Sequence, residues 1–343
     1  LGAREGELIF TSGGTESNNL AIFGAARALE KEGRKLSDMH FIASAIEHPS
    51  VLDCFTALSS RGARVSYAPV DGDGLIDPKK IGALVNKKTV LVSIGYGNGE
   101  IGTIQQIVTI AKELRRVSRA LAVQKPLFHT DASQALLFLP CVAEKLGVDL
   151  MTLDGQKIYG PKGVGALYYR RLPAQAGGVS LGRLFEGGEQ EFSLRPGTEN
   201  IPLIVGFAKA LELLSRPGKR EREGKRLEAL REHTMKRISE KIPDAKLNGH
   251  PRERLPNNIN ISLPGAEGEF LVLALDARGI AAGTGSACLS FKGDASYVVA
   301  ALGRKENAPA GTLRLSLGKE TTQKDINTAI DALADILRIQ RKY

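Results

Sequence analysis

A glycine-containing turn near the start of the chain has the residue types of an anion-binding loop. Residues 11–18 (T-S-G-G-T-E-S-N) follow an apolar strand pattern and open a helical pattern. Glycines let the backbone turn tightly, and the free N–H groups at a helix start bind phosphate or carboxylate. The segment lacks the G-K-[ST] of a P-loop and the G-x-G-x-x-G of a dinucleotide fold. It is therefore either an anion cradle or an ordinary strand-to-helix turn with a threonine cap.

A lysine in a glycine-bounded turn has the position needed for Schiff-base chemistry. Lys157 follows the apolar run 150–153, with glycines on both sides. A lysine amine that is partly removed from water is easier to deprotonate and then attacks carbonyl carbons. The alternative is a solvated loop lysine. Lys162 is a rival, but it follows Pro161 and fits a turn better.

Two further polar side chains follow apolar runs, at the kind of edge where open α/β sheets bind ligands. Asp131 ends the run 127–130, and it is either a ligand contact or the N-cap of the next helix. His48 lies at a strand-to-helix junction before Pro49, and proline is favoured at the first position of a helix. The imidazole of His48 has the shape to stack on a planar cofactor and the chemistry to carry protons, although a structural role is the alternative.

One of the three cysteines lies in a segment without helical or strand periodicity. Residues 283–294 are small and polar, so we expect a mobile loop, and this loop carries Cys288. Cys54 and Cys141 lie in apolar patterns and are expected in the core. A free thiol is a good nucleophile even at neutral pH. Cys288 is therefore the candidate nucleophile.

The elements that must position these residues alternate along the first part of the chain. Strands are expected at residues 7–11, 40–43, 64–68, 90–94, 127–130, 150–153 and 165–169. Helical patterns lie between them near residues 17–31, 49–60, 78–85, 107–119 and 132–137. Strands separated by helices predict βαβ units and a mostly parallel sheet flanked by helices.

The pattern changes after residue 200. Helices are expected at 201–214, 219–241, 267–278 and 322–341, and strands at 258–263 and 312–317. This mixture is typical of an α+β domain. We therefore predict a large α/β domain at residues 1–210 and a smaller α+β domain at residues 211–343, which carries the Cys288 loop.

Composition excludes several classes of protein. The chain has 343 residues, of which 42% are hydrophobic and 25% charged, so it is neither disordered nor collagen-like nor a disulfide scaffold. Nine of its 47 basic residues lie in 216–237 without interleaved aromatic residues, which favours a solvated helix over a nucleic-acid surface. No apolar run approaches the ~18 residues of a membrane span, and no signal peptide is recognised. Three cysteines without C-x-x-C spacing predict a cytoplasmic protein with no metal site.

Together these residues match the needs of one cofactor, pyridoxal 5′-phosphate (PLP). A lysine such as Lys157 forms a Schiff base with it, and an aspartate such as Asp131 pairs with the pyridinium nitrogen. That pairing keeps the ring protonated, so that the ring acts as an electron sink. The helix start after residues 11–18 supplies a cradle for its phosphate.

The chain closely resembles the cysteine desulfurases of the NifS/IscS group, which are fold-type I, class V PLP enzymes. The resemblance runs from Glu7 to about Asp335. Its motifs, in family order, are T-S-G-G-T-E-S-N-N-L-A-I, E-H-x-x-V-L-D, E-I-G-T, H-T-D-A-S-Q, K-I-Y-G-P-K-G-V-G-A-L-Y, R-P-G-T-E-N, G-S-A-C and L-R-L-S-L-G. The resemblance implies conversion of L-cysteine to L-alanine, with the sulfur carried as a persulfide on Cys288 for Fe–S cluster assembly or tRNA thiolation.

The resemblance also implies a role for each site residue. Lys157 would hold PLP and move the substrate α-proton, His48 would stack on the ring and shuttle protons, and Cys288 would attack the substrate sulfur. The residues implied to contact the cofactor are Gly14, Thr15, His48, Asp131, Gln134, Gln156, Lys157 and Thr198. In the family the residue at Thr198 reaches the cofactor of the other subunit, which implies a homodimer with shared active sites. Arg314 would bind the substrate carboxylate, and Asn98 lies beside the position of an asparagine that contacts substrate or cofactor.

Three positions depart from the family pattern. Asp154 and Gln156 stand where the family has a phosphate-binding serine and a histidine, and Gly99 replaces an asparagine. Two like charges ~4 Å apart cost roughly 4 kcal/mol at an effective dielectric constant near 20. We therefore expect Asp154 to point away from the phosphate, to be protonated or to be offset by cations. Gln156 keeps at most a hydrogen bond. Gly99 removes a side chain from the pocket, and weaker PLP binding and slower turnover are expected.

Two alternatives remain open. One is another class V PLP enzyme, a selenocysteine lyase or a small-amino-acid aminotransferase, although an aminotransferase has no need of a mobile thiol such as Cys288. The other is a catalytically weakened dimeric scaffold, against which the retained Lys157, Asp131, His48 and Cys288 argue. The expected partners are L-cysteine, a second subunit and sulfur-acceptor scaffold proteins, with neither nucleic acid nor a membrane. The family also has a segment before the position of Leu1 that contributes to the active site and the dimer.

Overall fold

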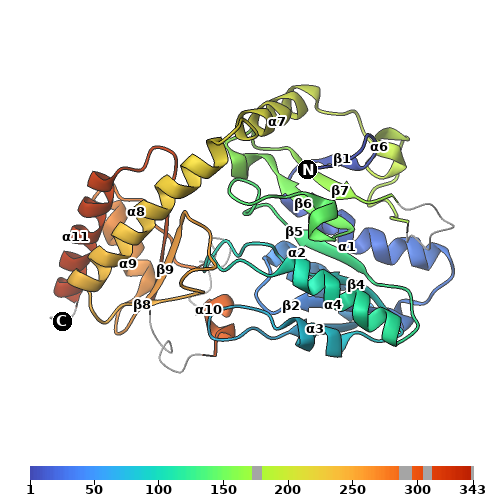
Figure 1. Ribbon diagram of the computed structural model, residues 1–343, viewed down its shortest axis with the longest axis horizontal. Helices are drawn as coiled ribbons and strands as arrows, with labels where there is room; N and C mark the ends of the chain where they lie inside the picture. The colour runs from blue at the N-terminus through green and yellow to red at the C-terminus, as the bar shows by residue number, and fades with distance from the viewer. Residues whose placement is uncertain (172–179, 286–295, 304–310, 341–343) are drawn as a thin grey trace. The chain divides into compact units, whose positions relative to one another are not determined.

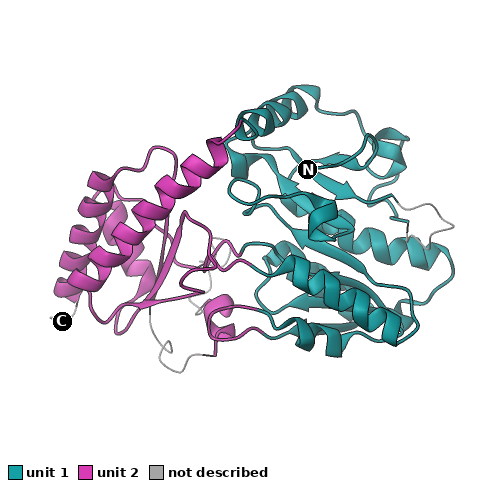
Figure 2. Cartoon of the chain, viewed as in Figure 1, with its two compact units in different colours: residues 1–69, 76–97, 105–216 teal, residues 70–75, 98–104, 217–343 magenta. Residues whose placement is uncertain are grey.

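The computed structural model describes residues 1–171, 180–285, 296–303 and 311–340. The chain divides into two compact units, which Figure 2 distinguishes by colour. Unit 1 comprises residues 1–69, 76–97 and 105–216, and unit 2 comprises residues 70–75, 98–104 and 217–343. Two short segments of the first third of the sequence therefore belong to unit 2. Cys288 and most of its expected loop lie outside the described residues.

A seven-stranded sheet forms the centre of unit 1 (Figure 1). Its strands are β1 (Leu8–Thr11), β2 (His40–Ser44), β3 (Arg64–Ala68), β4 (Thr89–Ser93), β5 (Leu127–Asp131), β6 (Leu150–Asp154) and β7 (Gly165–Tyr169). The order across the sheet is β1-β7-β6-β5-β4-β2-β3. The pairs from β3 to β6 are parallel, whereas β7 pairs antiparallel with both β6 and β1. The predicted α/β fold with a mostly parallel sheet is confirmed.

The central strands of unit 1 are buried because helices cover both faces of the sheet. Every residue of β2, β4, β6 and β7 is buried, so buried and exposed residues do not alternate along these strands. Phe41 of β2 meets Phe55 edge-on, with ring centroids 6.2 Å apart. Aromatic pairs in this geometry add to the free energy of burial.

The helices of unit 1 follow the strands. They are α1 (Gly14–Lys31), α2 (Pro49–Ser60), α3 (Pro78–Leu84), α4 (Ile107–Ala120), α5 (Ala143–Leu146), α6 (Gln190–Ser193) and α7 (Ile201–Leu214), with the 3₁₀ turns η1 (Leu36–Asp38) and η2 (Gly155–Ile158). Helix α1 packs on β6, β7 and α2, and α3 packs on α4. Because β3 and β4 flank β2 on opposite sides, right-handed crossovers place α2 and α3 on opposite faces of the sheet.

The predicted helix at residues 132–137 is wrong. The segment forms consecutive turns, in which Ala135 N and Phe138 N donate to the carbonyls of Ala132 and Ala135, three residues earlier. Pro140 follows a few residues later, and the residue before a proline is disfavoured in the α conformation. So short an apolar stretch has too few residues to continue beyond the unfavourable first helical turn.

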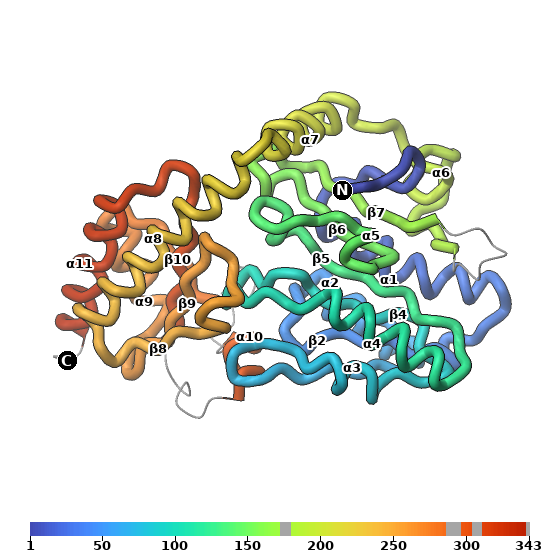
Figure 3. Tube along the Cα trace, viewed as in Figure 1, coloured from blue at the N-terminus to red at the C-terminus, as the bar shows by residue number. Residues whose placement is uncertain are grey.

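Unit 2 combines a small antiparallel sheet with helices. The sheet has the order β10-β9-β8, with β8 (Lys246–Leu247), β9 (Asn258–Leu263) and β10 (Gly311–Ser316). Its helices are α8 (Lys219–Lys241), α9 (Gly268–Asp276), α10 (Tyr297–Ala301) and α11 (Gln323–Gln340). Figure 3 shows the trace of α11 beside those of α8 and α9, against which it packs. Among the described residues, none of the helices is long and apolar enough to cross a membrane.

Much of the basic charge expected to face solvent on α8 is engaged within unit 2. Arg231 is buried and pairs with Glu228 and Glu232. Arg237 lies 2.6 Å from the carboxylate of Asp331 on α11. These contacts fix the orientation of α8, and they reduce the charge available to a nucleic-acid partner.

Candidate cofactor and active site

The polar residues singled out in the first part of the chain meet at one edge of the large sheet. The strand order reverses at β2, because β3 lies on one side of it and β4 on the other. In open α/β sheets, ligands bind beyond the carboxyl ends of the strands at such a point. Strands β1, β2, β4, β5 and β6 all run in the same direction. The segments that follow them, with Gly14, His48, Asp131 and Lys157, therefore share this edge.

The N-terminus of α1 forms a small polar cradle. The N–H of Gly14 donates to Asp154 Oδ2 over 3.3 Å. A Cβ added to Gly14 would lie 3.0 Å from Ser133 Oγ and 3.2 Å from Asp154 Oδ2, so these groups converge on the helix start. Ser133 is only 7% exposed, and its hydroxyl has no hydrogen-bond partner among the described residues. The cradle thus holds an unused buried donor beside the N–H groups that begin α1.

A glycine in the neighbouring strand makes the cradle possible. A Cβ on Gly165, the first residue of β7, would lie 2.7 Å from the backbone carbon of Gly13. Real Cβ atoms do not approach backbone so closely, and only glycine lets the turn before α1 rest against β7.

Asp131 is held at the carboxyl end of β5 by two donors. Its Oδ1 accepts the N–H of Ser133 over 2.9 Å, and its Oδ2 accepts Asn18 Nδ2 over 2.8 Å. Asp131 itself is half-buried. An ionised carboxylate is an acceptor with about four lone-pair sites, so two remain for a further donor.

His48 is the N-cap of α2. Its Nδ1 accepts the N–H of Ser50 over 3.1 Å and lies 2.8 Å from Ser50 Oγ. Pro49 takes the first helical position, as the sequence predicted. The ring of His48 is exposed, so one of its nitrogens is bound to the helix while the rest of the ring remains accessible.

Lys157 and its neighbours lie on η2, directly after β6. The side chain of Lys157 is exposed, and its amine makes no hydrogen bond or ion pair with a described residue. Asp154 caps η2, since its Oδ1 accepts the N–H of Gln156 over 3.1 Å and its Oδ2 lies 3.3 Å from Gln156 Nε2. Of the three alternatives expected for Asp154, pointing away from the cradle is wrong, because its Oδ2 accepts the N–H of Gly14 at the start of α1 while Gln156 donates to both of its oxygens.

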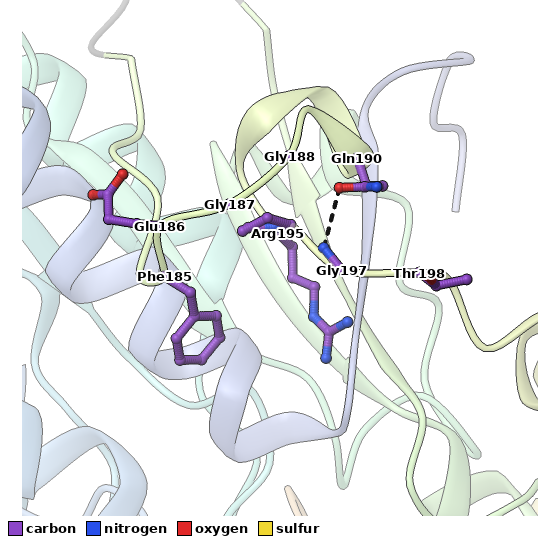
Figure 4. A pocket seen from close by; sticks show the side chains of 9 residues that line it. Phe185, Glu186, Gly187, Gly188, Gln190, Arg195, Gly197 and Thr198 are labelled. Atoms are coloured by element: carbon purple, nitrogen blue, oxygen red, sulfur yellow. Dashed lines mark hydrogen bonds between the residues drawn. The ribbon is translucent and has the colours of Figure 1, made fainter.

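Thr198 lies on an exposed loop that lines a separate pocket of about 370 Å³ (Figure 4). The pocket is lined by Phe185, Glu186, Gly187, Gly188, Gln190, Arg195, Pro196, Gly197 and Thr198. The N–H of Gly197 donates to Gln190 Oε1 over 3.1 Å, which Figure 4 marks. Arg195 donates to Glu16 in the first turn of α1 over 2.9 Å. The Thr198 loop is therefore tied to the helix that begins at the cradle.

The Arg195–Glu16 contact also keeps Glu16, in the first turn of α1, ionised. Burial raises the pKa of Glu16, but the hydrogen bonds from Arg195 and from Ser12 outweigh it, and the pKa lies below its ordinary value. Glu16 therefore stays ionised at neutral pH. Arg195 is correspondingly engaged and is not a free cation for a phosphate.

The sequence-predicted site residues Asn98 and Arg314 lie in unit 2, together with Gly99. The amide oxygen of Asn98 accepts the N–H groups of Glu100 and Ile101, both over 2.9 Å, so it closes its own turn. Arg314 on β10 donates to the carbonyl of Gly99 over 3.4 Å. Unit 2 thus brings Arg314 to the turn that carries Asn98. Thr15 and Gln134 lie in unit 1, in the first turn of α1 and in the turn after Asp131.

Two buried titratable residues were not found by sequence reasoning. Glu47 accepts Ser44 Oγ over 2.5 Å and the N–H of Gly95 over 2.9 Å, and burial raises its pKa to about 7. His129 lies between Ser93 Oγ and Thr152 Oγ1, and burial lowers its pKa to about 4. Both residues lie inside the quoted motifs, Glu47 one residue before His48 and His129 two residues before Asp131. Nothing in residue type or spacing shows that a polar side chain next to a motif is fully enclosed.

The two described cysteines are core residues, as predicted. Cys54 and Cys141 are buried, and neither is part of a disulfide. Burial raises the pKa of the Cys54 thiol to about 12, so this thiol stays protonated and unreactive. Within the described ranges, no group of histidine, cysteine and acidic side chains is arranged to hold a metal ion.

The residues at the sheet edge fit PLP. Its phosphate needs N–H and O–H donors, and the start of α1 and the unpartnered hydroxyl of Ser133 supply them. Its ring nitrogen needs an acceptor, which Asp131 would supply, and its aldehyde needs an amine, which Lys157 would supply. Asp154 is the member of this set whose charge opposes a phosphate.

The fold and this set of residues define a PLP-dependent enzyme of fold type I. Residues 1–328 match the family described as aminotransferase class-V, and the chain belongs to this family.

Named relatives cover nearly the whole chain. A protein named cysteine desulfurase IscS from Dictyoglomus turgidum is 41% identical over 337 residues, which are 98% of this chain and 80% of that protein. A protein of the same name from Methanosarcina thermophila is 42% identical over 338 residues, covering 98% of this chain and 78% of that protein. Among solved structures, a NifS-like protein superposes with a TM-score of 0.86 at 32% identity, covering 99% of this chain and 84% of that one.

Proposed function

We propose that this protein is a PLP-dependent cysteine desulfurase, which converts L-cysteine to L-alanine and retains the sulfur as a persulfide on Cys288. The observation that carries the proposal is the meeting of Gly14, His48, Asp131 and Lys157 at one sheet edge. Relatives of about 40% identity that bear this name over nearly the full length support it.

Six residues of unit 1 would hold the cofactor or move protons. PLP, when bound, withdraws electrons from the substrate α-carbon. Asp131 would hold a proton on the ring nitrogen, and Gln134 would donate to the ring hydroxyl. Lys157 would anchor the cofactor and then take the α-proton, since its exposed amine has no competing partner among the described residues. Gly14 and Thr15, with the hydroxyl of Ser133, would bind the phosphate.

The substrate would be held and attacked by residues of unit 2. Arg314 would bind the α-carboxylate through its planar guanidinium, and the Asn98 turn would border it. Cys288 Sγ would attack the substrate sulfur, so that an S–S bond forms while the C–S bond breaks. The electron pair of the broken bond stays with the carbon skeleton, which takes up a proton to become alanine. His48 would carry the protons for this chemistry.

The proposal also includes a homodimer. Ile201 and Val205 lie one turn apart on α7 and are 58% and 61% exposed. Phe185 and Phe192, from the segment around the Thr198 pocket, are also about half exposed. Exposed large apolar groups on successive turns of a helix, such as Ile201 and Val205, mark an interaction site. We propose that a second copy covers them and that Thr198 reaches the partner's phosphate.

The sulfur would pass from Cys288 to acceptor scaffold proteins, for Fe–S cluster assembly or tRNA thiolation. A persulfide delivers sulfur to any accessible thiolate, so the acceptor is a protein with a cysteine of its own. We also propose a cytoplasmic location, which the buried thiols of Cys54 and Cys141, neither of them in a disulfide, support.

The test is turnover of L-cysteine in the presence of PLP and a thiol reductant, with sulfide and alanine both measured. We expect equimolar products, none from Lys157→Ala, and normal amounts from the matched control Lys162→Ala. Cys288→Ser should bind PLP and yet release no sulfide. Turnover that survives in Cys288→Ser would contradict the persulfide route and favour a lyase or an aminotransferase, which selenocysteine and a keto-acid acceptor would then distinguish.

A second candidate is a dimeric scaffold without turnover, which one observation favours. Asp154 places a carboxylate at the start of α1, where it already takes the N–H of Gly14. A purified protein that neither binds PLP nor yields products at high PLP concentration would support this candidate.

A further inference from the structure

We propose that Asn18 and Ser50 are positioning residues that hold the imidazole of His48 in the tautomer with its proton on Nε2. They do so through one chain of hydrogen bonds, from Asp131 through Asn18 and Ser50 to His48. The tautomer follows from these contacts alone, whereas its value for catalysis rests on the proposed function.

The first link orients the amide of Asn18. Asn18 is 1% exposed, and its Nδ2 lies 2.8 Å from Asp131 Oδ2. An ionised carboxylate accepts hydrogen bonds and cannot donate them, so Asn18 must turn its NH₂ group toward Asp131. The opposite orientation would place the amide oxygen against a carboxylate oxygen.

The second link orients the hydroxyl of Ser50. The NH₂ group of Asn18 has two hydrogens, and the second is directed at Ser50 Oγ, 2.8 Å from Nδ2. Ser50 Oγ therefore accepts from Asn18, and its own hydrogen is free for another acceptor. That acceptor is His48 Nδ1, which lies 2.8 Å from Ser50 Oγ.

The third link determines which ring nitrogen of His48 carries no hydrogen. The backbone N–H of Ser50, which can only donate, also approaches His48 Nδ1 over 3.1 Å. Two donors thus converge on one nitrogen, and a hydrogen on Nδ1 would oppose the N–H of Ser50. A neutral imidazole carries one hydrogen, so it lies on Nε2.

In this arrangement Nδ1 of the His48 ring is hydrogen-bonded to Ser50, whereas the rest of the ring is accessible. Asn18 is buried, whereas His48 is exposed. A proton on Nε2 is therefore presented outward, away from the helix that Nδ1 caps. Because the chain begins at Asp131, the group proposed to hold the ring nitrogen and the group proposed to carry protons are oriented together.

The test reads the tautomer directly. Protein labelled with ¹⁵N in histidine is examined by long-range ¹H–¹⁵N NMR, with and without PLP, and the His48 signals are identified by their loss in His48→Gln. We expect an unprotonated Nδ1 and a protonated Nε2. Ser50→Ala and Asn18→Ala should each shift the tautomer ratio about five-fold toward Nδ1–H, which is what one ordinary hydrogen bond supports.

The controls separate positioning from folding. Ser50→Thr keeps the hydroxyl and should restore the wild-type ratio, and Ser60→Ala makes the same change at the other end of α2 without altering it. A wild-type protein with its proton on Nδ1, or an unchanged ratio in Ser50→Ala, would overturn the proposal. An inactive protein with the Nε2 proton would refute the proposed function and leave the tautomer assignment standing.

Discussion

At the scale of single residues, Asp154 distinguishes this chain from the family pattern. Its carboxylate lies in the cradle, where it accepts the N–H of Gly14 and approaches the amide of Gln156. It therefore takes up donors that a phosphate would use, and its charge repels a phosphate. The hydroxyl of Ser133, which has no hydrogen-bond partner among the described residues, is still able to donate to a phosphate.

We expect Asp154→Ser to bind PLP at least about ten-fold more tightly, since that factor is well within the Coulomb energy of two like charges at contact. Titration of the PLP-free protein, followed by absorbance, measures this. Pyridoxal lacks the phosphate and should bind both proteins equally, and Asp53→Ser on the exposed part of α2 is the matched control. Equal tightening of PLP and pyridoxal would show that Asp154 does not act on the phosphate.

Glu47 should make the stability of the protein depend on pH. Burial raises its pKa from 4.5 to about 7 in the folded state. The folded protein then holds this proton more tightly than the unfolded chain. Its contribution to stability is present below the ordinary pKa and is lost as pH rises through about 7.

In Glu47→Gln this loss should disappear, because a neutral amide replaces the titrating group. Urea unfolding at pH 5 and pH 8 should show the wild type losing about 2–3 kcal/mol more than the variant between the two values. Parallel pH profiles of the two proteins would contradict a raised pKa at Glu47.

At the scale of elements, the site depends on how the turn before α1 rests on β7. Gly165 begins β7, and a Cβ there would lie 2.7 Å from Gly13. The side-chain donor of the cradle, the hydroxyl of Ser133, belongs to another segment, but the turn determines where α1 begins. A change in a strand, outside the cradle, should therefore disturb it.

We expect Gly165→Ala to lower the free energy of unfolding by about 1–3 kcal/mol, the usual cost of overpacking, and to weaken PLP binding. Gly224→Ala on α8 is the matched control. A Cβ at Gly224 meets nothing within 4 Å, so this substitution should stabilise the protein by up to about 1 kcal/mol. Chemical denaturation measures both, and a neutral Gly165→Ala would show that the turn has room to move.

At the scale of the whole molecule, α7 exposes apolar side chains to solvent, and nothing in a single chain accounts for this exposure. Ile201 and Val205 would cost free energy in water unless a partner covers them. The proposed dimer covers them and brings Thr198 to the partner's cofactor.

Val205→Glu should therefore convert the dimer to a monomer and lower PLP retention, whereas Leu273→Glu should not. Leu273 on α9 of unit 2 is 69% exposed, so the control places the same charge on an equally open apolar position. Light scattering after size-exclusion chromatography measures the mass. A wild-type monomer, or a dimeric Val205→Glu, would refute α7 as the interface.

The sequence by itself determined the elements and the chemistry to look for. Strand positions follow from apolar runs, and the α1 turn, His48, Asp131 and Lys157 stand out because glycine, proline and polar residues interrupt those runs at strand ends. Such signals are local, so they can be read within a window of about ten residues. The predicted helix at 132–137 failed because a nearby proline and a short length outweigh apolar spacing.

Only the tertiary structure decided which of these residues touch. Gly14 meets Asp154 across 140 positions of the chain, and Asn18 meets Asp131 across 113. No periodicity encodes such pairs, because strand order and crossovers bring them together. The burial of a side chain is likewise decided by the tertiary structure. Burial raises the pKa of Glu47, and this burial arises because β2 and β4 are neighbours in the sheet.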